Sequence, residues 1–339
     1  MCLFSVSLFA FVALLQTIKP AILQKNLRYL YPHKMTYVQN GAILNERFKI
    51  DNYVGDWNGE RLFYAKDLQV DKPVILKAFD LEDPRINAHI ELFKECGGMQ
   101  GIPTFVDHFT TLGSEFIGWD ILLLFRFSMI FAVHSHTGIR LQSILNNCLF
   151  HISKENTIRI GYRLFRIIQS MHLKGFLHRD IRPLTIMCNV GENGELCVNL
   201  SYFGHAARID TPPLNNPIFL QLFHSLNVTR GGTYTRIDDY LSIVFVMLTC
   251  QTVNPFHFNT NRHLTVLEKK ENFHANPYGV LTPETMWLGD LYLQLEEMRT
   301  DRITHLQVMA AVRRAIPGFD PQSAITYRYD AENGHLLIN

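Results

Sequence analysis

Gly175-Phe-Leu-His178-Arg179-Asp180-Ile-Arg182-Pro183-Leu-Thr185 is the stretch on which the interpretation of this 339-residue chain depends. It follows a segment from about Lys154 to Leu173 whose apolar residues recur every three or four positions, which predicts a helix with one face on a core. A predicted hairpin turn at Gly191-Glu-Asn-Gly194 comes next, and then the run Ser201-Tyr202-Phe203-Gly204. The polar loop therefore lies between a core helix and a hairpin that ends in an aromatic-Phe-Gly triplet.

These two runs resemble the catalytic loop and the magnesium loop of protein kinases. In an active kinase the loop Asp accepts the proton of the substrate hydroxyl, an Asn five residues later holds one magnesium, and the Asp of Asp-Phe-Gly holds the metals on the phosphates. Asp180 fills the first position, but Thr185 and Tyr202 stand at the other two. A threonine hydroxyl carries no charge, and a tyrosine with a pKa of about 10 offers a neutral phenol in place of a carboxylate. The resemblance implies a kinase fold that has lost its chemistry.

Three runs with the character of strands precede the helix, and they predict a small antiparallel sheet: Phe48–Ile50, Arg61–Ala65 and Pro73–Phe79. Lys77 in the third run stands where the strand lysine of kinases contacts the nucleotide phosphates. Taken alone, it would be a surface lysine on a strand edge.

Kinases cover the phosphates with a Gly-rich loop, because glycine has no Cβ and lets the backbone approach closely. Of that pattern only Gly55 is in place, and Trp57 and Glu60 stand at the other two glycine positions. A tryptophan would crowd the phosphates and a carboxylate would repel them, so we expect ATP to bind weakly or not at all.

The segment Ile86–Cys96 predicts a helix that ends at Gly97-Gly98. In active kinases this helix supplies a Glu that pairs with the strand lysine. Glu91 is the nearest candidate, although counting back from the glycine pair puts Ala88 at the family position. The sequence leaves the ion pair open.

Two apolar runs, Ile121–Phe125 and Met129–Val133, follow where a kinase needs a single strand before the hinge between its lobes. We interpret Met129–Val133 as that strand and the residues near Ile117–Ser128 as an insertion. Runs of this apolar character can instead be buried strands.

A longer resemblance follows in the stretch from Phe223 to Ser242, which includes Ser225-Leu-Asn227 and Arg236-Ile-Asp238-Asp239-Tyr-Leu-Ser242. It is similar to the casein kinase I family, in its broad sense that includes the tau-tubulin kinase branch. This resemblance implies an α+β, bilobal, protein kinase-like fold with a small β-rich N-lobe and a larger, mostly α-helical C-lobe. The expected divisions are an N-terminal extension at 1–45, the N-lobe at 46–134, the C-lobe at 135–318 and a C-terminal tail at 319–339.

The resemblance also implies roles by position. Asp180 would be the catalytic base, Arg182 would stand for the phosphate-neutralising lysine, and Asp238 would brace the backbone of the catalytic loop from the buried helix at Tyr240–Cys250. The expected nucleotide-binding positions are Gly55, Lys77, Thr185 and Tyr202, and the expected structural positions are His178, Arg179, Phe203, Gly204, Asp238 and Asp239.

Two functions follow from these residues. The first is a casein kinase I-like pseudokinase, a binding or scaffold protein in signalling with protein partners, little or no phosphotransfer and no bound Mg²⁺. The alternative is an active serine/threonine kinase that moves the γ-phosphate of ATP with Asp180 as base. The sequence does not define an oligomeric state or a metal site.

Composition limits the other possibilities. Lys plus Arg (32) nearly balance Asp plus Glu (31), so no basic field favours nucleic acid. Cys188 and Cys197 flank the predicted hairpin turn and could face each other across it, although a disulfide is not favoured.

The apolar start, Cys2–Leu15, is shorter than the ~20 residues needed to cross a bilayer, so we expect no stable membrane span. It could be the core of a signal peptide, or translation could begin at Met35. We expect a cytoplasmic or nuclear protein, or a secreted one if residues 1–20 act as a signal peptide.

Overall fold

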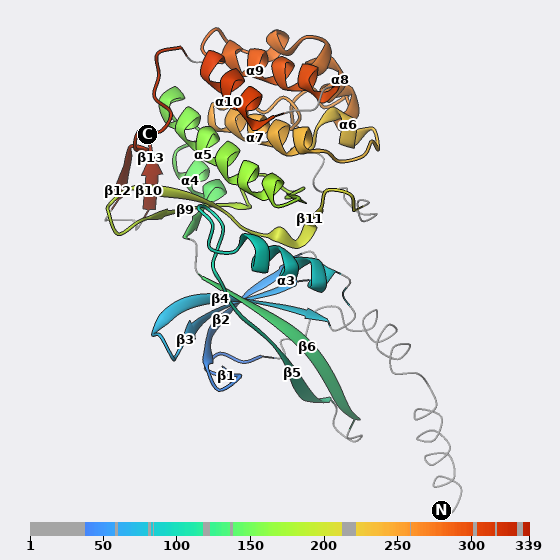
Figure 1. The fold of residues 1–339 in the computed structure, drawn as a ribbon, viewed down its shortest axis with the longest axis vertical. Coiled ribbons are helices and arrows are strands. Elements are labelled where there is room, and N and C mark those ends of the chain that lie inside the picture. Colours follow the sequence, from blue (N-terminus) through green and yellow to red (C-terminus); the bar gives the residue numbers. More distant parts are fainter. Residues whose placement is uncertain are drawn as a thin grey trace, which may run out of the picture.

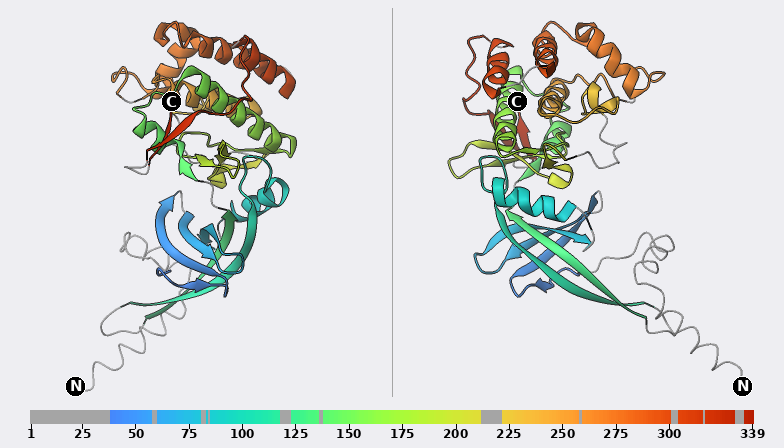
Figure 2. Two further views of the ribbon diagram at one scale, coloured as in Figure 1. Left: turned by 90° about the vertical axis from the view of Figure 1, so that its left-hand side faces the viewer. Right: turned by 45° about the vertical axis from the view of Figure 1, so that its right-hand side comes forward.

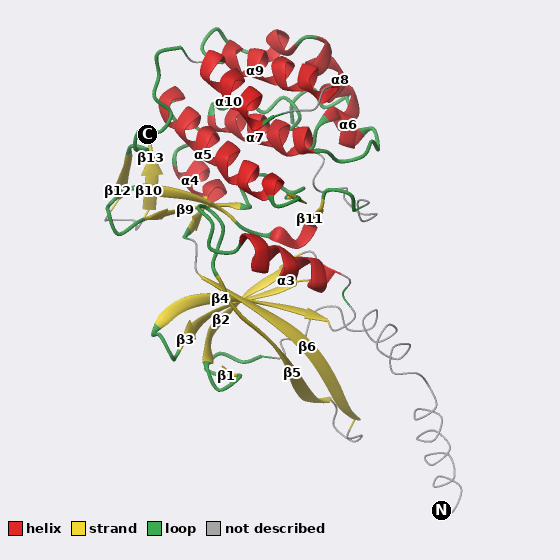
Figure 3. Cartoon of the chain, in the orientation of Figure 1, coloured by secondary structure: helices red, strands yellow, loops and turns green. Residues whose placement is uncertain are grey.

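The computed structural model describes residues 38–57, 60–80, 83, 85–117, 123–135, 138–211, 222–257, 259–300, 304–315, 317–330 and 335–339. In these residues the strands of one large sheet gather in the first part of the chain and most helices in the second (Figure 3). The sheet is antiparallel throughout, in the order β1-β2-β3-β4-β6-β5 (Figure 1). Its strands are β1 (Ile43–Leu44), β2 (Phe48–Trp57), β3 (Glu60–Asp67), β4 (Lys72–Asp80), β5 (Phe105–Ile117) and β6 (Leu123–Ser135).

The three strands expected before the first helix are confirmed as β2, β3 and β4. Their buried residues form a small core of their own, in which Phe48 and Phe63 are almost fully enclosed. The helix expected after them is also confirmed as α3 (Arg85–Cys96), and it lies beside the sheet (Figure 1). Phe93 on its inner face joins the core of the helical lobe, so α3 connects the two lobes.

The hairpin of β5 and β6 is longer than we expected. Its register runs without interruption from Ile117 opposite Leu123 to Asp107 opposite Val133. Within the segment near Ile117–Ser128 that we interpreted as an insertion, residues 123–128 are strand residues of β6. An antiparallel pair can continue beyond its sheet as a two-stranded ribbon, and β6 contains both Leu123–Phe125 and Met129–Val133. Residues 118–122 lie outside the described part.

The second lobe is built around α5 (Lys154–Leu173) and α7 (Arg236–Cys250), which pack against each other. Both helices were expected, and both are confirmed. Every residue of α7 after its first is buried, as its apolar character on all sides predicts. The other helices are α4 (Leu141–Asn147), α6 (Leu226–Thr229), α8 (Val266–Ala275), α9 (Met286–Glu297) and α10 (His305–Ala315), with 3₁₀ turns η1 (Phe203–His205), η3 (Pro277–Val280) and η4 (Met298–Thr300).

Short strands line the boundary between the lobes. They are β7 (Ile139–Arg140), β8 (Phe176–Leu177), β9 (Ile186–Val190), β10 (Leu196–Leu200) and β11 (Ala207–Arg208). In the hairpin β9–β10, Cys188 lies opposite Val198 and Cys197 opposite Asn189, and both thiols are free. The two cysteines therefore do not face each other across the turn, because the register places them one pair apart.

The last described residues form a hairpin, β12 (Tyr327–Asp330) and β13 (His335–Ile338), beside α4 (Figure 2). Leu336 and Ile338 are buried in the core of the helical lobe. The Asn156 amide of α5 donates hydrogen bonds to the carbonyl oxygens of Thr326 (2.9 Å) and Asn339 (2.7 Å). This segment thus packs as part of the helical lobe.

The bilobal α+β fold that the resemblance implies is confirmed: a β-rich lobe with one helix, and a larger helical lobe. No helix in the described residues is both long and apolar enough to span a membrane.

Candidate functional site

The expected catalytic loop lies between the lobes, and one carboxylate of α7 accepts hydrogen bonds from its backbone. Asp239 is fully buried and accepts hydrogen bonds of 2.9 Å from the backbone N–H groups of His178 and Arg179. Its oxygens also lie 2.9 Å from His172 Nε2 and from the hydroxyl of Tyr234. Burial alone would raise the pKa of Asp239, but the hydrogen bond from His172 and the two nearby imidazoles outweigh it and hold the pKa below its ordinary value.

The expectation that Asp238 braces this loop was wrong, since Asp239 does so. Asp238 is the third residue of α7, and its carboxylate turns back to accept from the backbone N–H and the hydroxyl of Thr235 in a capping box. It also accepts from Ser225 (2.5 Å) and Arg299 (2.8 Å). Successive side chains of a helix point about 100° apart, so Asp239 faces the loop and Asp238 does not.

Asp180, the expected catalytic base, is paired with Arg182. Arg182 Nε lies 2.7 Å from one carboxylate oxygen and Nη2 3.3 Å from the other, and both side chains are buried. The guanidinium of Arg182 thus lies directly beside the Asp180 carboxylate. A planar guanidinium favours this two-point contact.

Thr185, at the position of a metal-binding Asn, is used by the loop itself. Its hydroxyl lies 2.7 Å from the Asp180 carbonyl and accepts from the backbone N–H of Arg182 at 3.1 Å. The residue has no exposed surface. A hydroxyl has one proton and two lone pairs, so these contacts leave it little capacity for a metal ion.

His178 and Phe203 join the loop to α3. The ring of Phe203 lies 5.0 Å from that of Phe93 on α3 and 5.0 Å from the imidazole of His178. His178 Nδ1 accepts the backbone N–H of Asp180 and its Nε2 donates to the Ser201 carbonyl, which fits a neutral ring. Burial lowers the pKa of His178 to about 4. Gly204 follows Phe203 within η1.

Tyr202, to which the resemblance assigns the place of a metal ligand, is in contact with two cationic side chains. Its hydroxyl accepts a hydrogen bond of 2.6 Å from Arg140 Nη2, whose guanidinium carbon is 5.5 Å from the ring centroid. Lys77 Nζ lies over the same ring at 5.3 Å. The backbone of Tyr202 is left-handed, with φ of 59°, a conformation that costs a bulky residue about 1 kcal/mol. Tyr202 as a whole is only 8% exposed.

The β-rich lobe brings Lys77 to the site but not the helix glutamate. Lys77 is buried on β4, next to Tyr202. Glu91, the nearest candidate for that glutamate, instead pairs with Arg208 of β11 at 2.5 Å. Gly55 lies on β2 opposite Leu62, with φ of 141°, and a Cβ there would meet no atom within 4 Å.

Arg179 ties the catalytic loop to the segment that follows η1. Its Nη2 donates to the carbonyl oxygen of Thr211 at 2.5 Å and lies 3.4 Å from that of Arg208. Residues 212–221, which come next, lie outside the described part. Backbone carbonyls thus hold Nη2 of the loop arginine, while its Nε is buried with no hydrogen-bond partner among the described residues.

Sequence reasoning missed Arg140. It lies on β7, 62 residues before Tyr202, and no local motif connects the two positions. The available signal was chemical, because a buried phenol normally has a hydrogen-bond partner and an arginine can donate to its oxygen.

A lobe of antiparallel strands with one helix, a helical lobe, and a braced His-Arg-Asp loop between them define the chain as protein kinase-like. Over 170 aligned residues it is 26% identical to a probable casein kinase I homolog of Encephalitozoon cuniculi (strain GB-M1), and the match covers 47% of this chain and 46% of that relative. The chain thus spans about half the length of this relative. No family model matches the chain.

Proposed function

We propose that this chain is a casein kinase I-like pseudokinase: a binding or scaffold protein in signalling, with weak or no ATP binding and little or no phosphotransfer. The single observation that carries the proposal is the contact of Tyr202 with Arg140 and Lys77 at the position of the metal-binding aspartate.

The donor set at this position does not suit a divalent cation. Mg²⁺ prefers carboxylate oxygens and water in an octahedral arrangement. The Tyr202 phenol is neutral, the Thr185 hydroxyl is used by the catalytic loop, and Asp180 is paired with Arg182. Arg140 and Lys77 add positive charge beside the phenol, which would repel a metal ion. Phosphoryl transfer depends on positioning and on charge stabilisation by the metal, so its loss would cost many powers of ten in rate.

The alternative is an active serine/threonine kinase, and one contact favours it: Asp180 is held beside Arg182 on a loop that Asp239 braces. A base and a cation in this arrangement could still orient a hydroxyl. No feature of the described residues supplies a second carboxylate for metal at Tyr202.

Transfer of radiolabelled phosphate from ATP to protein substrates tests the proposal, with Tyr202→Asp as the comparison and Asp180→Asn as the blank. We expect the unmodified protein to match the blank with or without Mg²⁺. Magnesium-dependent transfer above the blank by the unmodified protein would contradict the proposal and favour the active kinase.

Thermal denaturation with ATP is the second test. A ligand that binds only the folded form raises the midpoint of unfolding. We expect millimolar ATP to change it by less than about 1 °C, and added Mg²⁺ to bring no increase. A shift of several degrees that requires Mg²⁺ would contradict the proposal.

A further inference from the structure

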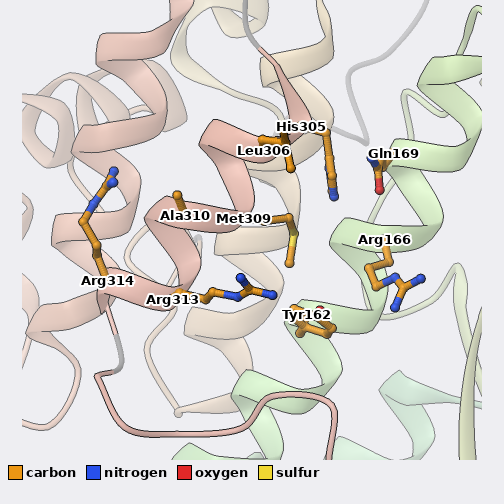
Figure 4. Close-up of a pocket in the computed structure, with 9 residues that line it drawn as sticks. All are labelled: Tyr162, Arg166, Gln169, His305, Leu306, Met309, Ala310, Arg313 and Arg314. Carbon is orange, nitrogen blue, oxygen red and sulfur yellow. The ribbon is translucent and has the colours of Figure 1, made fainter.

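A groove lies between α5 and α10 in the helical lobe, apart from the catalytic loop. Tyr162, Arg166 and Gln169 line it from α5, and the facing side is formed by one surface of α10 (Figure 4). Its volume is about 450 Å³. We call it the α5–α10 groove; its α10 residues are His305, Leu306, Met309, Ala310, Arg313 and Arg314.

The charge of this groove is of one sign. Among the described residues that line it, three are arginines, one is a histidine and none is acidic. Within the described residues, the side chains of Arg166 and Arg313 make no hydrogen bond or ion pair, whereas Arg314 donates to Gln294 at 3.1 Å. Figure 4 shows Arg313 reaching from α10 toward Tyr162, while Arg314 lies on the far side of the helix. Two arginines from opposite walls are therefore available to one ligand.

His305 also lies in this positively charged part of the groove. Its imidazole projects between the helices in Figure 4, and its Nδ1 is buried without a partner among the described residues. Burial first, and then the charge of Arg166, lower the pKa of His305 to about 4. A hydrogen-bond acceptor in the groove could bind the proton of Nδ1 in the neutral imidazole. A negatively charged ligand would in addition offset the positive charge of Arg166.

The groove also offers apolar surface. Leu306 is 79% exposed, although it lies on a helix whose Val308 and Val312 are fully buried. Met309 lies on the wall beside it, and a flexible thioether adapts to side chains of different shape. A free inorganic anion would use the arginines and leave Leu306 in water. A peptide with carboxylates on either side of an apolar residue would use both.

We propose that the α5–α10 groove binds an acidic peptide segment of a protein partner, in which Asp or Glu residues flank an apolar side chain. Carboxylates would pair with Arg166 on one wall and Arg313 on the other, since guanidinium groups bind carboxylates in two-point contacts. The apolar side chain would cover Leu306 and Met309. This binding goes beyond the proposed function, because none of the groove residues belongs to the catalytic loop.

Fluorescence polarisation of a labelled peptide in which Glu residues flank two Leu residues tests the inference with the full chain. We expect saturable binding that weakens with salt, because exposed charge pairs are screened. The double change Arg166→Glu/Arg313→Glu should weaken binding at least about tenfold, and Arg166→Gln/Arg313→Gln about threefold to fivefold. The glutamine variant still tests the proposal if the two charge reversals disturb folding.

The matched control is Lys72→Glu/Arg328→Glu, which changes net charge equally at two exposed positions outside the groove. It should leave the affinity within about twofold.

Leu306→Ser tests the apolar contact. It should weaken binding of the Glu/Leu peptide severalfold without affecting binding of a peptide of Glu and Ser. Equal loss in the groove and control variants, equal binding of the two peptides, or no binding by the unmodified chain would overturn the proposal. This experiment measures peptide binding and not phosphotransfer, so its result can fail independently of the proposed function.

Discussion

Arg140 Nη2 donates a hydrogen bond of 2.6 Å to the phenolic oxygen of Tyr202, across 62 positions of sequence. The contact joins β7, at the start of the helical lobe, to the loop that in an active kinase carries the metal-binding aspartate. The side chain of Tyr202 is thus held by a contact between two distant parts of the protein.

The first prediction concerns the energy of this contact. Tyr202→Phe keeps the ring beneath Lys77 but removes the hydroxyl. We expect it to lower the free energy of unfolding by about 1.5–3 kcal/mol, the range for a hydrogen bond to a charged group. Urea denaturation measures the change. Arg140→Met provides the second arm of a double-mutant cycle, and we expect a coupling energy of at least about 0.5 kcal/mol. Strict additivity of the two changes would show that the contact contributes nothing.

The second prediction concerns the brace of the catalytic loop. Asp239→Asn leaves one amide oxygen where four donors converge, so we expect a loss of about 3 kcal/mol in unfolding free energy. Hydrogen exchange of the amides of His178 and Arg179 should accelerate. Asp238→Asn is the matched comparison, since it disturbs the cap of α7 and should leave these two amides protected. Equal exchange in the two variants would contradict the assignment of the brace to Asp239.

Much of this architecture could be predicted from the sequence, because regular elements follow local patterns. The apolar repeat of Lys154–Leu173 gave the bounds of α5, and Gly97-Gly98 marked the end of α3. The length of the β5–β6 hairpin could not be predicted, since the pairing of two distant runs is set by register and not by composition.

The site was less predictable than the fold. The loop positions, including Asp180 and Tyr202, came from their motifs. Which of Asp238 and Asp239 contacts the loop depends on the residue at which α7 begins. A sequence pattern does not define a helix boundary to a single residue. Arg140 was missed because its contact with Tyr202 is tertiary.

The third prediction concerns pH. The pKa of His178 is about 4 in the folded chain, because of burial, and about 6.5 when unfolded. Between these values the unfolded state binds more protons, so this contribution to stability is present above pH 6.5 and is lost as the pH falls toward 4, by up to about 3 kcal/mol. His205 and His224, also with pKa values lowered to about 4 by burial, act in the same direction.

Urea denaturation at pH 7 and pH 5 measures this effect. His178→Gln keeps hydrogen-bonding groups but does not titrate, so it should lose less stability on acidification than the unmodified chain. His151→Gln changes an exposed residue and serves as the control. An unaltered loss of stability in His178→Gln would show that this imidazole does not titrate on unfolding.

The fourth prediction compares two glycines that share a left-handed backbone. Gly138, next to β7, has φ of 101°, and a Cβ there would lie 2.2 Å from the carbonyl oxygen of Cys188. Gly194 has φ of 77°, and a Cβ would meet nothing within 4 Å. Gly194→Ala should therefore cost only the conformational term, about 1 kcal/mol, and Gly138→Ala at least about 3 kcal/mol. Similar midpoints of urea denaturation for the two variants would contradict this difference.

The fifth prediction concerns the hairpin β12–β13, which the sequence suggested as a tail. Leu336 and Ile338 are 3% and 1% exposed and lie in the core of the helical lobe. Replacing either with alanine should lower the free energy of unfolding by about 2–4 kcal/mol, because the change removes buried methyl groups and leaves a cavity. Tyr329→Ala on the same hairpin is the control, since its side chain is 61% exposed and should change stability by less than about 0.5 kcal/mol. If Leu336→Ala and Ile338→Ala were as mild as this control, the hairpin would contribute nothing to the core against which it packs.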